Sequence, residues 1–273
     1  MRYLRAGSGP PLVLLHGLLG YSFSWRYTIP ALAAQCTVYA VDQLGVGFSE
    51  RVPGLDCSLR ACAERVLHFL DHIQVPACDL LGTSHGGAAA MMAAALSQQR
   101  GGVPVKRLVL VAPVNPWSAH GRQLAPILSS SPVAAFIRLL APMTGPAHSL
   151  FLKRLYGDTR RIPPGTLEGY AAPFRIPGTV DHALGVLRSW DRDLDELEKA
   201  ITVIAGVPTL LVWGDRDAAV SVRSAEVLRA KFRSCELAVL RGAGHLPYEE
   251  MPEDFNRIVN GFLDVRGVPA FPL

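Results

Sequence analysis

The stretch from Cys78 to Met91 constrains the fold of this chain more than any other part of the sequence. Its centre, Gly82–Thr83–Ser84–His85–Gly86, follows the pattern G-x-S-x-G after an apolar segment. A turn sharp enough to raise a serine at the start of a helix needs glycines on both sides, because Cβ atoms there would clash. The alanine-rich run after the turn favours a closely packed helix. The stretch therefore predicts a strand, a nucleophile elbow at Ser84 and a helix, a context that an ordinary Gly/Ser-rich loop lacks.

A second loop shows features of an anion-binding site. Pro11–Leu15 is a continuous apolar segment, typical of a strand covered on both faces, and it runs into His16–Gly17–Leu18. Backbone N–H groups in such a loop stabilise the oxyanion of an acyl-transfer reaction, together with the N–H that follows the nucleophile. We predict these two donors to be the N–H groups of Leu18 and His85. His16 is expected to brace the loop without touching substrate.

The sequence does not indicate a cofactor or a metal site. The glycines of Asp42–Ser49 include G-x-G, but the third glycine that should open a helix is missing, so we reject nucleotide binding. The histidines of the helical segments and the central stretch, among them His148 and His182, show no metal-ligand spacing and are expected to be structural or solvated. We therefore predict no cofactor and no metal.

Composition favours a globular protein that acts on a small molecule. The 273 residues are 49% hydrophobic, with a formal net charge of +4 and no run of Lys or Arg longer than two. This charge pattern indicates neither a nucleic-acid partner nor stable membrane association. The five cysteines have no metal-ligand spacing, and the N-terminus lacks the long apolar segment of a signal peptide. We expect reduced cysteines and a cytoplasmic location; the oligomeric state stays open.

The central third of the chain reads as a helical insertion. From Pro113 prolines recur between short apolar pieces, and no strand pattern returns until Thr209. A connection this long and this apolar predicts a helical cap at residues 113–204, inserted into a core formed by residues 1–112 and 205–273. Most of its large apolar side chains are expected to form the core of the cap, and some to face the nucleophile: Trp117, Leu124, Ile127, Leu128, Phe136, Ile137, Leu140, Met143, Phe151, Tyr156, Tyr170, Phe174 and Trp190.

Two chemically useful residues follow the strands predicted after this insertion. Thr209–Trp213 leads to Asp215 and Asp217, and the strand Cys235–Leu240 leads to His245. The crossover of a βαβ unit places the carboxyl ends of its two strands side by side. We therefore expect His245 to meet an aspartate, with Asp217 favoured over Asp215 as its partner.

Ser84, Asp217 and His245 occur in the chain order of the α/β-hydrolases, and the resemblance extends over most of the chain. Besides the elbow it includes Leu14–Gly17, Asp42–Ser49, Trp213–Asp217 and Gly242–Pro252. The chain resembles the group that contains esterases, epoxide-hydrolase-like enzymes and C–C hydrolases. This resemblance implies an α/β-hydrolase fold, in which helices cover a mostly parallel central sheet and an inserted helical cap overlies the site.

The same resemblance implies a serine hydrolase. We expect Ser84 as nucleophile, His245 as base and Asp217 as the acid that orients it, acting through an acyl-enzyme on carboxylic esters with apolar or aromatic groups. The nucleophile here is a serine, whereas the epoxide hydrolases and dehalogenases that the chain resembles use an aspartate. This difference disfavours both of those activities. Three alternatives stay open: a C–C bond hydrolase of vinylogous diketones, a cofactor-free perhydrolase or haloperoxidase, and a ligand receptor on the hydrolase scaffold.

Overall fold

A computed structural model of the protein describes residues 1–140 and 146–264. Within them a seven-stranded sheet runs in the order β1-β3-β2-β4-β5-β6-β7, and only β1 is antiparallel to its neighbour. The predicted mostly parallel sheet is confirmed. The strands are β1 (Arg2–Ala6), β2 (Pro11–Leu15), β3 (Thr37–Asp42), β4 (Cys78–Thr83), β5 (Val105–Val111), β6 (Thr209–Gly214) and β7 (Cys235–Leu240).

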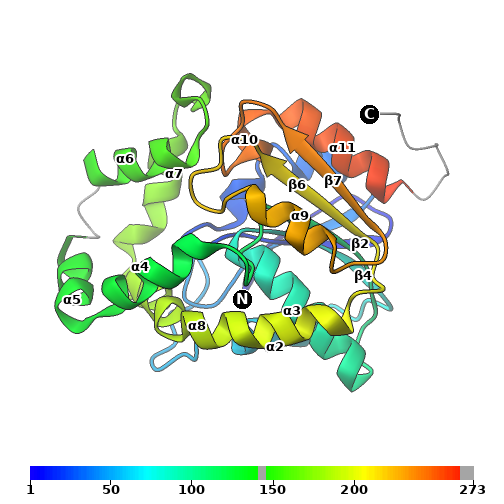
Figure 1. The fold of residues 1–273 in the computed structure, drawn as a ribbon, viewed down its shortest axis with the longest axis horizontal. Helices are drawn as coiled ribbons and strands as arrows, with labels where there is room; N and C mark the ends of the chain where they lie inside the picture. Colours follow the sequence, from blue (N-terminus) through cyan, green and yellow to red (C-terminus); the bar gives the residue numbers. More distant parts are fainter. Residues whose placement is uncertain (141–145, 265–273) are drawn as a thin grey trace.

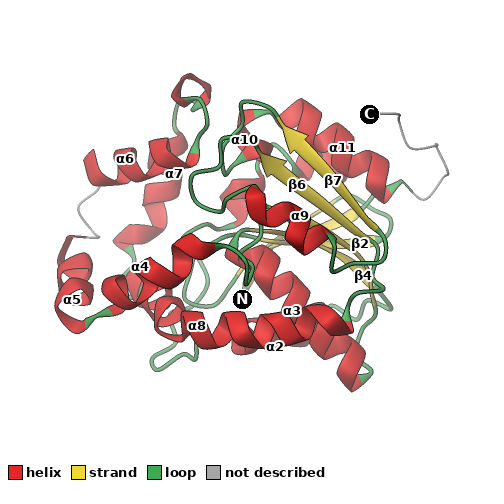
Figure 2. Ribbon diagram, viewed as in Figure 1, coloured by secondary structure: helices red, strands yellow, loops and turns green. Residues whose placement is uncertain are grey.

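Helices cover both faces of this sheet, as Figures 1 and 2 show. Because side chains alternate between the two faces of a strand, the sheet separates two buried apolar clusters. The first cluster includes side chains of α2 (Leu59–His72), α3 (His85–Arg100), α9 (Arg223–Arg229) and the second half of α8 (Thr179–Val203). The second includes side chains of α1 (Ile29–Leu32) and α11 (Pro252–Leu263).

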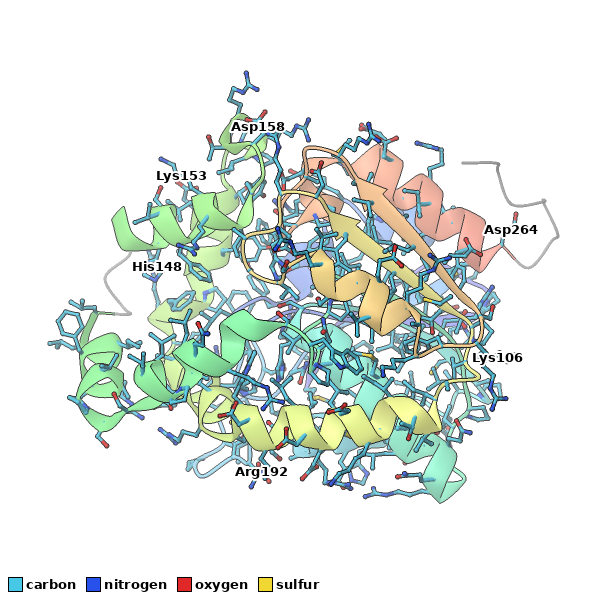
Figure 3. All side chains as sticks on the ribbon, in the orientation of Figure 1. Lys106, His148, Lys153, Asp158, Arg192 and Asp264 are labelled. Carbon is cyan, nitrogen blue, oxygen red and sulfur yellow. The ribbon has the colours of Figure 1, made fainter. Side chains whose placement is uncertain are left out.

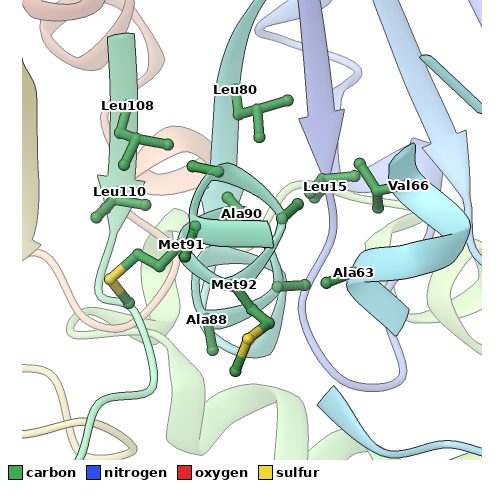
Figure 4. Close-up of a cluster of buried hydrophobic side chains, with 14 of the residues drawn as sticks. Leu15, Ala63, Val66, Leu80, Ala88, Ala90, Met91, Met92, Leu108 and Leu110 are labelled. Atoms are coloured by element: carbon green, nitrogen blue, oxygen red, sulfur yellow. The ribbon is translucent and has the colours of Figure 1, made fainter. Parts of the chain in front are cut away.

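Helix α3 packs closely against the centre of the sheet. Its alanines and methionines lie among side chains of β2, β4, β5 and α2, including Leu15, Leu80 and Leu108 (Figure 4). Small side chains let the helix backbone approach the strands, which agrees with the alanine-rich run in the sequence. This packing fixes the N-terminus of α3, and with it Ser84, at the carboxyl end of β4.

The chain between β5 and β6 is helical, with no strand among its described residues. It contains α4 (Ala119–Ser129), α5 (Ser131–Leu140), α6 (Pro146–Leu155), α7 (Thr166–Ala171), the 3₁₀ helices Thr159–Arg161 and Ala172–Arg175, and α8. The short helix α10 (Pro247–Glu250) lies outside this stretch, between β7 and α11. Leu194, Leu197 and Ile201 of α8 belong to the cluster against the sheet. The second half of α8 therefore covers the core, while the cap boundaries 113–204 stay a prediction.

The expectation that the large apolar side chains of this region lie in the cap core or face the nucleophile is wrong for three residues. Ile127, Phe136 and Leu140 are 40–60% exposed. Helices α4, α5 and α6 lie on the side of the molecule toward which β6 and β7 point (Figure 1), and these three side chains, which belong to α4 and α5, meet solvent. Met143 lies outside the described residues.

Candidate active site

Ser84 occupies the sharp turn that the sequence predicts. Its φ of 52° and ψ of −123° lie outside the ordinary regions for a non-glycine residue. A Cβ on Gly82 would lie 2.3 Å from the carbonyl oxygen of Gly86, and a Cβ on Gly86 would lie 2.3 Å from those of Leu15 and His16. The flanking glycines therefore allow strand, turn and helix to approach each other, and the surrounding packing holds Ser84 in its strained conformation.

His245 and Asp217 form a hydrogen-bonded pair. The Nδ1 of His245 lies 2.8 Å from Oδ2 of Asp217, and the Asp217 side chain is fully buried. Oδ1 of Asp217 accepts hydrogen bonds from the backbone N–H groups of Ala219 and Val220 at 2.8 and 2.9 Å. With Nδ1 donating to the carboxylate, Nε2 of His245 is left as the ring's proton acceptor.

Asp215 has a different environment. It is exposed, and its Oδ1 accepts a hydrogen bond from the backbone N–H of Gly242 at 2.6 Å. This hydrogen bond joins the loop after β6, which contains Asp215, to the loop after β7, which contains Gly242. Asp215 thus acts as a turn aspartate, and the pairing with His245 falls to Asp217.

The loop after β2 is braced by His16. Its Nδ1 lies 2.9 Å from the carbonyl oxygen of Gly17, and its Nε2 accepts a hydrogen bond from the backbone N–H of Gln43 at 3.1 Å. Burial lowers the pKa of His16, although its contact with Gly17 opposes the shift. A neutral ring that donates through Nδ1 and accepts through Nε2 satisfies both contacts. These contacts support the bracing role expected for His16.

A cavity of about 560 Å³ joins these elements. Ser84, His245, Leu18 and His85 all line it, and Asp217 lies behind His245. Most of the remaining wall is apolar and comes from both parts of the chain, for example Val220 and Leu246 from the loops of the core, and Leu124, Leu152 and Trp190 from the helices between β5 and β6. The geometry therefore places a nucleophilic side chain at the floor of an apolar chamber.

His85 contributes its backbone to this site and keeps an uncharged ring. Burial lowers its pKa to about 4, with the positive charge of Arg65 adding to the shift. The ring stacks on Trp190 at a centroid distance of 6.4 Å. As the first residue of α3, His85 has a backbone N–H that no carbonyl of the helix can accept, so this N–H is available at the helix N-terminus.

Sequence reasoning missed one residue of the cavity wall. His148, expected to be structural or solvated, lines the cavity and packs edge-on against Phe174 at 4.9 Å; Figure 3 labels it. Trp190, one of the side chains of which some were expected to face the nucleophile, lines the cavity too. The Nδ1 of His148 and the Nε1 of Trp190 are buried without a hydrogen-bond partner among the described residues. No spacing pattern in the sequence distinguishes His148, because it reaches the cavity through the packing of α6.

Two adjacent buried glutamates tie the His245 loop to the helical insertion. Glu250 accepts hydrogen bonds from the backbone N–H groups of Gly244, Gly157 and Asp158 at 2.6, 2.9 and 3.2 Å. Burial raises the pKa of Glu250, which these hydrogen bonds partly offset. The backbone N–H of His245 itself donates to the carbonyl oxygen of Leu155 in α6 at 2.7 Å. His245 is therefore held through its ring by Asp217 of the core and through its backbone by Leu155 of the helical insertion.

Glu249 makes a second set of contacts with the same region. Its carboxylate accepts hydrogen bonds from Arg26 at 2.8 Å, from the hydroxyl of Tyr156 at 2.6 Å and from the hydroxyl of Tyr170. Arg26 also donates to Oγ1 of Thr166 at 3.1 Å. Tyr156, Thr166 and Tyr170 belong to the chain between β5 and β6, so this network joins that part of the chain to the core.

Metal ligands are not evident in residues 1–140 and 146–264, where no group of three or more His, Cys, Asp or Glu side chains is arranged to hold an ion.

Comparison with known proteins identifies the family. The sequence pattern described as the alpha/beta hydrolase fold matches residues 10–252. The chain belongs to this family. Members that resemble it differ in activity: a dihydrolipoyllysine-residue acetyltransferase component of an acetoin cleaving system from Pseudomonas putida is 32% identical over 96% of this chain, which spans only 66% of that relative's length.

Two relatives in the alpha/beta hydrolase fold family match over nearly their whole length. A pimeloyl-[acyl-carrier protein] methyl ester esterase from Aeromonas hydrophila is 29% identical, with 95% of this chain and 97% of the relative covered. A 2-hydroxy-6-oxo-2,4-heptadienoate hydrolase from Pseudomonas putida is 26% identical, with 94% and 90% covered. One relative is thus named as an esterase and the other as a hydrolase, and the substrates in their names differ.

Proposed function

We propose that this protein is a serine hydrolase that cleaves carboxylic esters with apolar or aromatic groups through an acyl-enzyme. One observation carries the proposal: the strained Ser84 shares a cavity with His245, whose Nδ1 lies 2.8 Å from a fully buried Asp217. A nucleophile, a base and an orienting acid in this order are the parts that acyl transfer requires.

In the proposed mechanism, Oγ of Ser84 attacks the ester carbonyl and its proton passes to Nε2 of His245. Asp217 holds the imidazole in position and stabilises the imidazolium that forms. The tetrahedral oxyanion accepts hydrogen bonds from the N–H groups of Leu18 and His85, with the N-terminal dipole of α3 adding positive potential. His245 then protonates the departing alcohol and activates the water that releases the acid.

The wall of the cavity supports the substrate class. Apart from Arg154, the lining consists of side chains without a carboxylate, ammonium or guanidinium group, such as Leu124, Leu152 and Leu246, and burying apolar groups of the ester against these leucines is favourable. The relative named as a methyl ester esterase, similar over almost its full length, also supports ester cleavage. An ester whose acyl or alcohol group is apolar should therefore react faster than one that carries a charge.

The test is hydrolysis of a p-nitrophenyl ester series by the wild type, by Ser84→Ala and by Ser118→Ala. Removing the nucleophile should lower kcat on the order of a millionfold, as for the serine of other triads. Ser118 lines the same cavity without being part of the triad, so its variant is the matched control and should retain activity within about tenfold. Equal rates for wild type and Ser84→Ala would refute the proposal.

A C–C bond hydrolase is the second candidate, since one relative is named as a hydrolase of a hydroxy-oxo-heptadienoate. The same assays distinguish the two functions. If a vinylogous diketone is cleaved with a kcat/KM well above that of every ester, and Ser84→Ala abolishes this turnover, the second candidate replaces the first.

A further inference from the structure

Helices α4, α5 and α6 present large apolar side chains to solvent. We define the cap surface by seven of them, which are 40–71% exposed: Leu124, Ile127, Phe136, Leu139, Leu140, Leu150 and Phe151. All seven come from three short helices on one side of the molecule, where α4 packs against α5 and α6 lies apart from them (Figure 1). An accumulation of exposed apolar side chains on this scale marks an interaction site in a stable protein.

The cations of the same stretch differ in their partners. Between Val114 and Gly157 the sequence contains Arg122, Arg138, Lys153 and Arg154 and no aspartate or glutamate. Arg122 and Arg138 pair with aspartates of α8, so Lys153 and Arg154 are the cations of this stretch without an ion pair among the described residues. Lys153 and Arg154 are exposed in the last turn of α6, beside Leu150 and Phe151 (Figure 3 labels Lys153). Apolar side chains bordered by cations fit a lipid surface, because its acyl-chain interior is apolar and its headgroups can be anionic.

The shape of α4 and α5 agrees with a position along such a surface. Among the described residues no single helix is long and apolar enough to cross a membrane. Gly121–Ser129 and Ser131–Leu140 reach that length and composition only as a pair, and the pair is bent by 81°. Two short apolar helices at a large angle can lie side by side in the plane of an interface, where an amphipathic helix buries one face.

The cap surface continues into the cavity. Leu124 and Phe151 belong to it and also line the chamber that holds Ser84. Arg154, next to them in α6, lines the chamber as well. A molecule held against the cap surface would therefore lie at the entrance side of the chamber.

We propose that the cap surface docks reversibly on an anionic lipid surface, with its leucines and phenylalanines among the acyl chains and Lys153 and Arg154 at the headgroups. A second copy of this chain fits less well, because its cap surface carries the same two cations, Lys153 and Arg154, and residues 114–157 offer no acid to pair with them. Docking itself does not require catalysis. Its consequence, the supply of lipid esters to Ser84, rests on the proposed function.

The test measures co-sedimentation with vesicles, using the Ser84→Ala protein so that no lipid is hydrolysed. Vesicles contain phosphatidylcholine with phosphatidylglycerol, or phosphatidylcholine alone. We expect binding to the anionic vesicles, reduced on the order of a hundredfold by Leu139→Ser with Leu150→Ser, since each exposed leucine loses its burial in lipid. Val227→Ser with Val239→Ser removes two exposed apolar side chains outside the cap surface and should bind unchanged.

A second pair of variants tests the charge. Lys153→Glu should weaken binding to the anionic vesicles several-fold, whereas Lys199→Glu on the exposed side of α8 should weaken it less. Absence of vesicle binding, equal binding by the leucine variants, or equal binding to neutral vesicles would overturn the proposal. So would a dimer in solution that the leucine variants convert to monomer. The p-nitrophenyl ester assay with soluble substrates is scored separately, so failure of the esterase function is distinguishable.

Discussion

The two aspartates near His245 differ by two positions in sequence and completely in environment. Asp217 is buried against Nδ1 of His245, whereas the exposed Asp215 accepts a hydrogen bond from Gly242. We predict that Asp217→Asn lowers kcat about ten-thousandfold, because the amide favours the wrong imidazole tautomer. Asp215→Asn is the matched control and should stay within about tenfold, since only a turn contact changes. Steady-state kinetics on a p-nitrophenyl ester measure both; similar losses would contradict the assignment of Asp217.

The sequence predicts single site residues best where they directly follow the ends of strands. Ser84, Asp217 and His245 could be predicted as site residues because glycine-containing turns after apolar segments mark the carboxyl edge of a parallel sheet. The roles of Glu249 and His148 could not be predicted, because each meets its partners only after the helices pack. The tyrosines that donate to Glu249 lie 79 or more residues away along the chain, and the phenylalanine that packs against His148 lies 26 residues away. The residue types of Glu249 and His148 alone indicate a solvated surface.

The close approach of strand, turn and helix in the nucleophile elbow depends on Gly86, which has no Cβ. A Cβ on Gly86 would lie 2.3 Å from two backbone oxygens of the β2 loop, atoms that cannot move without displacing β2. We predict that Gly86→Ala lowers the free energy of unfolding by about 3 kcal/mol or more. Urea denaturation followed by circular dichroism measures the change.

The control for this substitution is another helical glycine. Gly261 lies in α11 with open space where a Cβ would be. Gly261→Ala should leave stability unchanged or raise it by about 0.5–1 kcal/mol, because alanine loses less entropy in a helix. If Gly86→Ala were as stable as Gly261→Ala, close approach would not explain the glycine of the elbow.

The helices of the central stretch show where sequence periodicity loses its power. Proline recurrence and the absence of a strand pattern predict helices there, and α4 to α8 agree. The large apolar side chains named there were expected mostly inside, yet Ile127 and Phe136 are 59% and 60% exposed. Periodicity identifies the apolar face of a helix but not whether protein, substrate or lipid covers it.

For the whole molecule, the question is how the helical insertion stays on the core above an apolar chamber. Glu249 provides part of the answer, because its buried carboxylate accepts hydrogen bonds from Arg26 of the core and from Tyr156 and Tyr170 of the insertion. A buried charge with several donors fixes one geometry more strictly than apolar packing does. The wall of the chamber therefore depends on a polar network outside it.

We predict that Glu249→Gln lowers the free energy of unfolding by about 3 kcal/mol, because the guanidinium of Arg26 remains largely buried without its counter-charge. Glu253→Gln, at an exposed position of α11, is the matched control and should change stability by less than about 0.5 kcal/mol. Urea denaturation measures both. Limited proteolysis adds the location: the Glu249 variant should be cleaved faster within residues 113–178, where the insertion has lost its tie to the core. Faster cleavage spread evenly over the chain would mean that Glu249 stabilises the core alone, and the network would not be what holds the insertion in place.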